Sequence, residues 1–140
     1  MSYVRQVVVF DAADVAAESA FWAGMHAGRV VDDDPRFHCV IDDAGNWIIG
    51  VQHAPDHVPP EWPDGAPQQM HVDLHATDPE AAHTRALQLG ARLLQDGDPL
   101  ANPDEGYRVY ADPAGHPFCI GWGHPSATQL ADFLATLPPA

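Results

Sequence analysis

One short stretch of the chain carries most of the side chains that could do chemistry. His71, Asp73 and His75 alternate with apolar residues in the run HVDLHA. Successive side chains of a β-strand point to opposite faces, so these three polar residues share one face of a predicted strand. An imidazole beside a carboxylate suits proton transfer, because the carboxylate fixes the tautomer of the ring. His71 and Asp73 are therefore the candidate catalytic pair.

Three interpretations of this polar strand face stay open. It can simply face solvent, as one side of many sheets does. It can line a pocket and hydrogen-bond a ligand without catalysis, or it can supply a general acid, a general base or a metal ligand. His75 stands nearest the end of the predicted strand, so simple exposure explains it best of the three.

A cysteine and several aromatic residues extend the candidate site. Cys119, in the run PFCIGW, is a nucleophile or a soft metal ligand if its pKa is lowered, and an inert core residue otherwise. Aromatic walls combined with one amide favour a flat or apolar organic ligand, although each aromatic residue could instead pack in the core. The candidate ligand-binding residues are Trp47, Gln52, Trp62, His71, Asp73, Tyr107, Cys119 and Trp122.

The sequence contains an internal repeat, and the fold of the two copies must position those residues. VVVFDAADVAA near the start is answered by HVDLHATDPEA, so that Val8 corresponds to Val72 and Asp14 to Asp78. Each copy runs strand, helix, short strand, strand, strand, which predicts an α+β fold of two tandem βαβββ modules. We expect a single domain with module 1 at about residues 3–53 and module 2 at about 70–122. A doubled unit of this kind makes its pocket between the copies.

Prolines and helix-capping residues mark the boundaries of these elements. Residues 54–69 hold five prolines and predict a stiff connector without helix or strand, with Trp62 either packed on the body or exposed as a pocket wall. The second helix is expected to begin at Thr77 or Asp78, with Thr77 and Glu80 forming a capping box. Leu130, Phe133, Leu134 and Leu137 have helical spacing and predict a further helix at about 126–137, packed on the body or on a partner subunit.

Composition excludes several classes of function. Twenty acidic and six basic side chains give a net charge of −14, which disfavours binding to nucleic acid or to an anionic membrane surface. No apolar run approaches the ~18 residues of a spanning helix, and two cysteines are too few for a disulfide framework, so we expect a cytoplasmic protein. The sequence has no glycine-rich phosphate loop, nucleophile elbow or paired CxxC motif.

The order of elements, with HVDLHATD opening the second module and ADPAGHPFCIGW closing it, resembles the vicinal oxygen chelate (VOC) superfamily. Within it, the chain is most similar to small glyoxalase-like and bleomycin-resistance-like domains, several of which carry a P-x-W-P connector like that at Pro60–Pro63. The resemblance covers about residues 4–122 and implies a curved, mixed sheet that encloses a cleft. The same fold serves lyases, isomerases, dioxygenases, thiol transferases and binding proteins, so it does not fix the chemistry.

The resemblance also implies where a metal would bind. Metal-using members take one ligand from the first strand and one from the last strand of each module. In module 2 these positions fall on His71 and Cys119; in module 1 they fall on Val7 and Ile49, or on Gln6 and Gly50 if the register shifts by one. Open metal sites need about three protein ligands. We therefore expect no cofactor and no obligatory divalent metal; His71 and Cys119 would hold one if it bound.

The sequence therefore predicts a protein that binds a small organic molecule in the cleft between the modules. The alternative is a lyase or isomerase of the same fold that uses His71 as a base or as a metal ligand. The resemblance also implies a homodimer, because members of this fold often dimerise, and the apolar helix at 126–137 favours that assembly.

Overall fold

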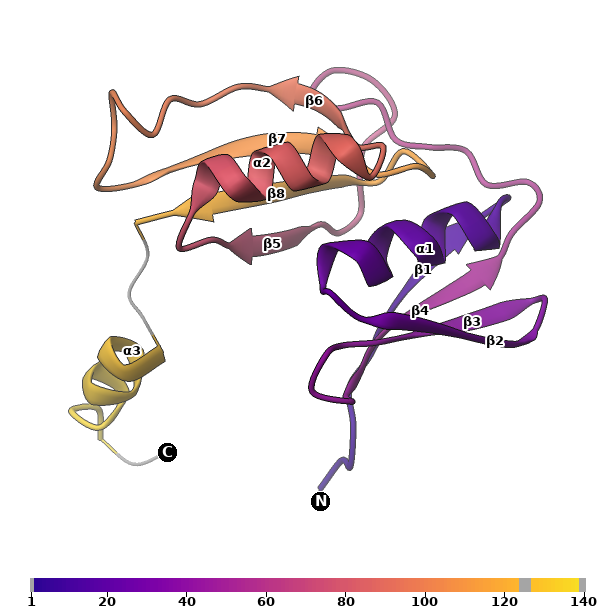
Figure 1. Cartoon of the computed structure of the whole chain (residues 1–140), viewed down its shortest axis with the longest axis horizontal. Helices are drawn as coiled ribbons and strands as arrows, with labels where there is room; N and C mark the ends of the chain where they lie inside the picture. Colours follow the sequence, from indigo (N-terminus) through magenta and orange to yellow (C-terminus); the bar gives the residue numbers. More distant parts are fainter. Residues whose placement is uncertain (1, 124–126, 139–140) are drawn as a thin grey trace.

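Each half of the chain forms its own four-stranded sheet with one helix packed against it (Figure 1). The computed structural model describes residues 2–123 and 127–138. Module 1 comprises β1 (Val8–Ala12), α1 (Val15–Met25), β2 (Arg29–Asp34), β3 (Phe37–Ile41) and β4 (Trp47–His53). Module 2 comprises β5 (Val72–His75), α2 (Pro79–Gln88), β6 (Arg92–Gln95), β7 (Gly106–Ala111) and β8 (Pro117–Trp122), and α3 (Ala127–Leu134) follows.

The two sheets repeat one topology. Their strand orders are β1-β4-β3-β2 and β5-β8-β7-β6, and in each the first strand runs parallel to the last while the other pairs are antiparallel. The predicted α+β fold of tandem βαβββ modules is confirmed. The mixed sheet divides into two, since within the described residues no strand of one module is hydrogen-bonded to a strand of the other.

Both module helices begin at an aspartate. The Asp14 carboxylate accepts a hydrogen bond from the Ala17 N–H at 2.9 Å, and the Asp78 carboxylate accepts one from the Ala81 N–H at 3.0 Å. Each bond satisfies an amide that has no partner inside the helix. The predicted capping box of Thr77 and Glu80 is therefore wrong: the aspartate, one residue later, caps α2, and Glu80 binds an arginine of β7 instead.

An aromatic cluster joins the modules. The fully buried indole of Trp22, on α1, stacks on Phe10 with ring centroids 5.0 Å apart and meets Phe118 of β8 edge-on at 5.3 Å. Phe21 reaches the same Phe118 ring at 5.7 Å. Large aromatic surfaces buried together stabilise such a contact by several kcal/mol, on the order of 2 kcal/mol for each ring. The two modules therefore share one core.

Two buried carboxylates cross the same interface. The indole Nε1 of Trp22 donates to Glu18 Oε1 at 2.9 Å and to Asp112 Oδ2 at 3.2 Å. The Ala114 N–H donates to Glu18 Oε2 at 2.9 Å, and the His116 N–H donates to Asp112 Oδ1 at 2.8 Å. Burial, followed by the hydrogen bond and the charge of Asp112, raises the pKa of Glu18 to about 9, and burial also raises the pKa of Asp112. At neutral pH the Glu18 carboxyl therefore keeps its proton.

The connector at 54–69 contains no helix or strand, as its prolines predict, but it is held against module 2. His57 Nε2 lies 3.0 Å from the Ala114 carbonyl oxygen, and Pro59 packs on the turn at Gly115. Gly115 has φ +89°, and a Cβ there would lie 2.4 Å from the Cβ of Pro59, so the turn requires glycine. This anchoring brings the second half of the connector to β5 and β8.

The last helix is shorter than expected and is not buried. It spans Ala127–Leu134 rather than 126–137, and Ser126 lies outside the described residues. Its apolar residues Leu130, Phe133 and Leu134 are exposed. In this single chain the helix therefore does not pack on the body. Across the residues that the structure describes, helices with the length and hydropathy to span a membrane are absent.

Candidate functional site

A cavity of about 320 Å³ lies on the face of the second sheet that is turned away from the core. Five of the eight predicted ligand-binding residues line it: Trp62, His71, Asp73, Tyr107 and Cys119. Gln68, His75, Val109 and Pro117 complete most of its wall. The structure thus brings together residues from the connector, β5, β7 and β8.

Strand register explains why these side chains meet. Asp73 of β5 pairs with Cys119 of β8, which pairs in turn with Val109 of β7, so the three form one row across the sheet. The next row pairs His75, Gly121 and Tyr107. Because side chains alternate along each strand, both rows face the cavity while the intervening residues face the core.

Asp73 contacts both other members of the polar cluster, His71 and Cys119. Its Oδ1 lies 3.3 Å from His71 Nε2, and the exposed fractions of the His71 and Asp73 side chains are 43% and 53%. Burial, followed by the hydrogen bond to Asp73 and its charge, raises the pKa of the Cys119 thiol to about 11. At neutral pH the thiol is therefore protonated, and it donates to the carboxylate. A protonated thiol is a poor nucleophile, so the raised pKa argues against Cys119 as a catalytic nucleophile.

The cavity wall carries negative but no permanent positive charge. Asp73 is its only carboxylate, and within the described part of the chain its lining includes no lysine or arginine. The whole chain has a net charge of −14 at pH 7. An anionic ligand would meet unfavourable electrostatics here, whereas a neutral or cationic one would not.

A metal of the kind that the resemblance implies does not fit the residues present. The ligand atoms of His71, Asp73 and Cys119 lie within 4.8 Å of one another, but all three belong to module 2. In module 1, Val9 pairs with Gly50 as Asp73 pairs with Cys119, so Gly50 is the counterpart of the cysteine. The first placement, on Ile49, is therefore wrong, since that residue is buried in the core.

With this register, the two module 1 positions are Val7 and Gly50, neither of which has a side-chain donor. Cys119 would have to release its proton to bind a metal, since the metal ligand is the thiolate. The four-ligand site of the metal-using members is therefore not present in this chain.

Three predicted residues lie outside the cavity. Trp47 packs edge-on against Phe37 with centroids 6.3 Å apart and donates to the Ile49 carbonyl oxygen at 2.9 Å. Gln52 is exposed near the end of β4, in module 1. Trp122 is buried and donates to the Asn102 carbonyl oxygen at 2.9 Å, so it fixes the loop before β7 instead of lining the cavity.

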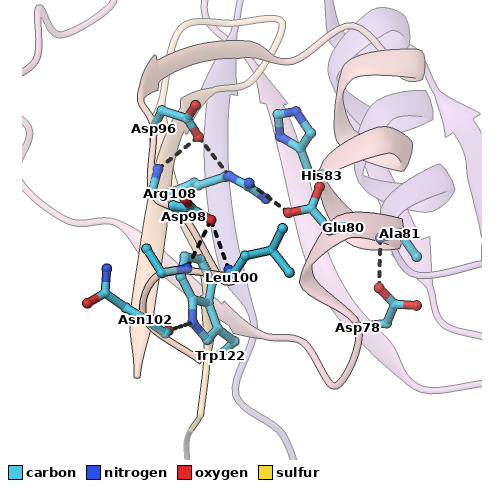
Figure 2. Close-up of polar contacts among 12 residues, drawn as sticks. Asp78, Glu80, Ala81, His83, Asp96, Asp98, Leu100, Asn102, Arg108 and Trp122 are labelled. Atoms are coloured by element: carbon cyan, nitrogen blue, oxygen red, sulfur yellow. Dashed lines mark hydrogen bonds and ion pairs between the residues drawn. The ribbon is translucent and has the colours of Figure 1, made fainter. Parts of the chain in front are cut away.

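A buried arginine supports the strand that carries Tyr107. Figure 2 shows the Arg108 guanidinium between two carboxylates, with its Nε 2.9 Å from Asp96 Oδ1 and its Nη2 2.8 Å from Glu80 Oε1. These contacts tie β7 to α2 and to the end of β6. The sequence analysis missed this cluster, because nothing local distinguishes Arg108 from an exposed strand residue.

A second cavity of about 380 Å³ lies between the modules, where the sequence predicted the pocket. It is lined by β1, by the connector and by the start of β5, and it shares Gln68 and His71 with the first cavity. Gln68 was not predicted as a site residue. Only its place in the proline-rich connector pointed to it, and a connector does not reveal which of its residues turn inward.

A duplicated βαβββ unit is the architecture of VOC proteins. A sequence profile of the family described as Glyoxalase-like domain matches residues 7–121, and the chain belongs to that family. Among curated proteins, no sequence matches the chain.

Solved structures share the fold at low sequence identity. A glyoxalase/bleomycin resistance protein/dioxygenase family enzyme from Burkholderia phytofirmans is 17% identical, with a TM-score of 0.62 over 84% of this chain and 97% of that one. The fosfomycin resistance protein FosX from Listeria monocytogenes is 13% identical, with a TM-score of 0.64 over 89% and 96% of the two chains. A glyoxalase-related enzyme from Fulvimarina pelagi is 18% identical, with a TM-score of 0.60 over 84% and 86%.

Proposed function

We propose that this protein binds a small neutral or cationic organic molecule in the cavity on β5 and β8, without an obligatory metal. The observation that carries the proposal is the convergence of two aromatic side chains, Trp62 and Tyr107, on a carboxylate, Asp73, in one cavity. Its volume of about 320 Å³ lies at the lower end of the 300–1,000 Å³ typical of small-molecule sites.

Each wall of the cavity supports this ligand chemistry. Trp62 and Tyr107 offer flat apolar faces, and an aromatic face also attracts a cation. The Asp73 side chain is half exposed, so it avoids the desolvation penalty of a buried carboxylate. The absence of a side-chain ligand at both module 1 positions supports metal independence. The fosfomycin resistance proteins among the structural neighbours make antibiotics a reasonable class to include in a ligand screen.

Matched probes test the proposal. 1-Naphthylmethylamine is a flat cation, and 1-naphthalenemethanol is its neutral isostere. We expect Trp62→Leu to weaken both probes about five- to tenfold, the loss of one aromatic contact, and Asp73→Asn to weaken only the amine. Trp47→Leu is the control, since Trp47 lies outside the cavity. Equal binding by the Trp62 and Trp47 variants in calorimetry would contradict the proposed site.

A second candidate function is metal-free acid/base catalysis, as in a lyase or isomerase. The 3.3 Å contact between His71 Nε2 and Asp73 Oδ1 favours it, because the carboxylate orients the imidazole toward one proton-transfer role. We expect His71→Ala to abolish turnover of a true substrate while binding is retained, and His53→Ala, at an exposed residue outside both cavities, to leave turnover near the wild-type rate. Loss of binding together with the absence of turnover at any pH would exclude this function.

We further propose that the protein is a cytoplasmic homodimer. Both cysteines are free, as is common in proteins of a reducing compartment. The exposed apolar residues of α3, Leu130, Phe133 and Leu134, would be covered by a second copy of the chain. Light scattering at micromolar concentration tests this: Phe133→Asp should shift a dimer to a monomer, and a wild-type monomer would refute the assembly.

A further inference from the structure

Three side chains of different donor chemistry meet on one wall of the first cavity. The ligand atoms of His71, Asp73 and Cys119 lie within 4.8 Å of one another, and across the part of the chain that the structure describes no other group of three such side chains comes as close. Asp73 is the direct partner of Cys119 in the parallel pair of β5 and β8, and His71 lies two residues before it. The register of two paired strands therefore sets the cluster.

The spacing of these atoms is close to that of a tetrahedral zinc site. Bonds of about 2.0–2.3 Å to Zn²⁺ place neighbouring ligand atoms about 3.3–3.7 Å apart. The 3.3 Å between His71 Nε2 and Asp73 Oδ1 already matches, and the other pairs need to close by about 1 Å at most. All three side chains line the cavity and are at least partly exposed, so an ion can reach them and they can rotate toward it.

The donor set selects the kind of metal. A cysteine sulfur suits a borderline-soft ion such as Zn²⁺, whereas Mg²⁺ and Mn²⁺ prefer oxygen ligands. Imidazole and carboxylate are also ordinary zinc ligands, and three protein ligands with one open position make the open form of a zinc site. The four-ligand site of the metal-using members draws on both modules, whereas this cluster belongs to module 2 alone.

The charges of the cluster match those of the ion. On binding, the Cys119 thiol would pass its proton to the solvent, leaving a thiolate beside the Asp73 carboxylate. These two negative charges offset the two positive charges of Zn²⁺. Within the described residues the cavity lining includes no lysine or arginine that would repel the ion, and the net charge of −14 attracts cations to the molecule.

We propose that His71, Asp73 and Cys119 bind one Zn²⁺ ion, with the fourth coordination position open to the cavity. The site is additional to the proposed function, which needs no ion, and it is reversible because its ligands are partly exposed. Module 1 offers no equivalent, since Val9 and Gly50 stand where Asp73 and Cys119 stand in module 2.

Calorimetry with Zn²⁺ on untagged protein, previously cleared of metal with EDTA, tests the site. We expect one ion per chain for the wild type. Cys119→Ser changes one atom of the side chain and should weaken Zn²⁺ at least tenfold, because the loss of even an indirect partner of a zinc ligand costs about that much. Asp73→Asn and His71→Ala should each weaken it to a similar extent.

The matched control is Cys39→Ser, which removes the other free cysteine, in β3 and outside both cavities. It should bind Zn²⁺ as the wild type does. The melting temperatures of the metal-free proteins check that every variant is folded. A variant with a wild-type melting temperature and weakened Zn²⁺ binding has lost a ligand and not the fold.

Co²⁺ in place of Zn²⁺ identifies the sulfur ligand independently of affinity. A bond between Co²⁺ and a thiolate gives a charge-transfer band in the near ultraviolet. We expect this band in the wild type and in Cys39→Ser, and its loss in Cys119→Ser.

Several results would overturn the site: no Zn²⁺ bound by the wild type, equal affinity of Cys119→Ser and the wild type, or a Co²⁺ band that is absent or is lost in Cys39→Ser instead. None of them affects the proposed function, which is measured with organic probes on metal-free protein. Conversely, failure of 1-naphthylmethylamine to bind would refute the proposed function without refuting the zinc site.

Discussion

Replacing Glu18 with glutamine should remove much of the pH dependence of stability near neutral pH. Glu18 is fully buried between the modules, next to Asp112, with its pKa raised to about 9. Glutamine has nearly the same size, cannot ionise, and can still donate to the Asp112 carboxylate. The substitution therefore isolates the titration of a single buried group.

The magnitude follows from the two pKa values. In the unfolded chain Glu18 titrates near 4.5, and in the folded protein near 9. Between these pH values the unfolded chain has lost the Glu18 proton that the folded protein keeps. The contribution of Glu18 to the free energy of unfolding is therefore greatest below pH 4.5 and falls as pH rises toward 9. One proton corresponds to about 1.4 kcal/mol per pH unit, so the wild type loses on the order of 3 kcal/mol through Glu18 between pH 6 and pH 8. Glu18→Gln loses none through this position.

Urea denaturation at pH 6, 7 and 8, followed by tryptophan fluorescence, measures the difference. Both proteins carry the same nine histidines, so these residues do not separate the two curves. At low pH the variant should be the less stable of the two, because its amide cannot accept from both Trp22 and Ala114, and the curves should converge or cross as pH rises. Glu105→Gln, at an exposed site, should follow the wild type. If Glu18→Gln gives a curve parallel to that of the wild type, the buried carboxyl does not hold its proton as argued.

Three further measurements bear on the site and its support. In a Cys39→Ser background, Asp73→Asn should lower the pKa of Cys119 from about 11 while burial keeps it above 9.0, which the pH dependence of thiol alkylation would record; an unchanged profile would mean that Asp73 does not act on the thiol. Arg108→Met should destabilise the fold by about 1–2 kcal/mol in urea, because two ion pairs are lost. The loss stays this small because both carboxylate partners are exposed and regain water. An unchanged free energy of unfolding would show that the ion pairs add nothing. Exhaustive treatment with EDTA should leave affinity for 1-naphthylmethylamine unchanged and elemental analysis should find no stoichiometric metal; a loss of affinity would overturn metal independence.

Local signals in the sequence were sufficient to predict the order of the elements. The turns at Gly45 and Gly115 have φ +88° and +89°, and they close equivalent hairpins in the two modules. Asp14 and Asp78 cap equivalent helices. Each of these features depends on a few neighbouring residues and on backbone sterics, so the duplication could be recognised from the printed sequence.

The composition of the cavity was only partly predictable. The alternation in HVDLHA placed His71 and Asp73 on one face, and the structure brings both to the cavity with Cys119. Along β8, Trp122 lies on the same face as Phe118, which is buried in the core, whereas Cys119 lies on the opposite face. The alternation of side chains along the strand alone therefore separates Trp122 from Cys119. The Glu18 and Asp112 contacts join residues from opposite halves of the chain, and no pattern within either half contains that information.

The difference between the modules explains why the site uses one half of the chain. In module 1, the counterpart of Cys119 is Gly50, and a Cβ at that position would lie 2.5 Å from Cζ of Phe37 and 3.2 Å from Cγ2 of Val9. The Phe37 ring itself packs against Trp47, so it cannot move aside without disturbing a second aromatic side chain. Restoring a carboxylate ligand at position 50 would therefore require repacking of this face as well as a change of one residue. The packing of module 1 thus excludes a ligand at position 50, which accounts for the absence of the four-ligand metal site.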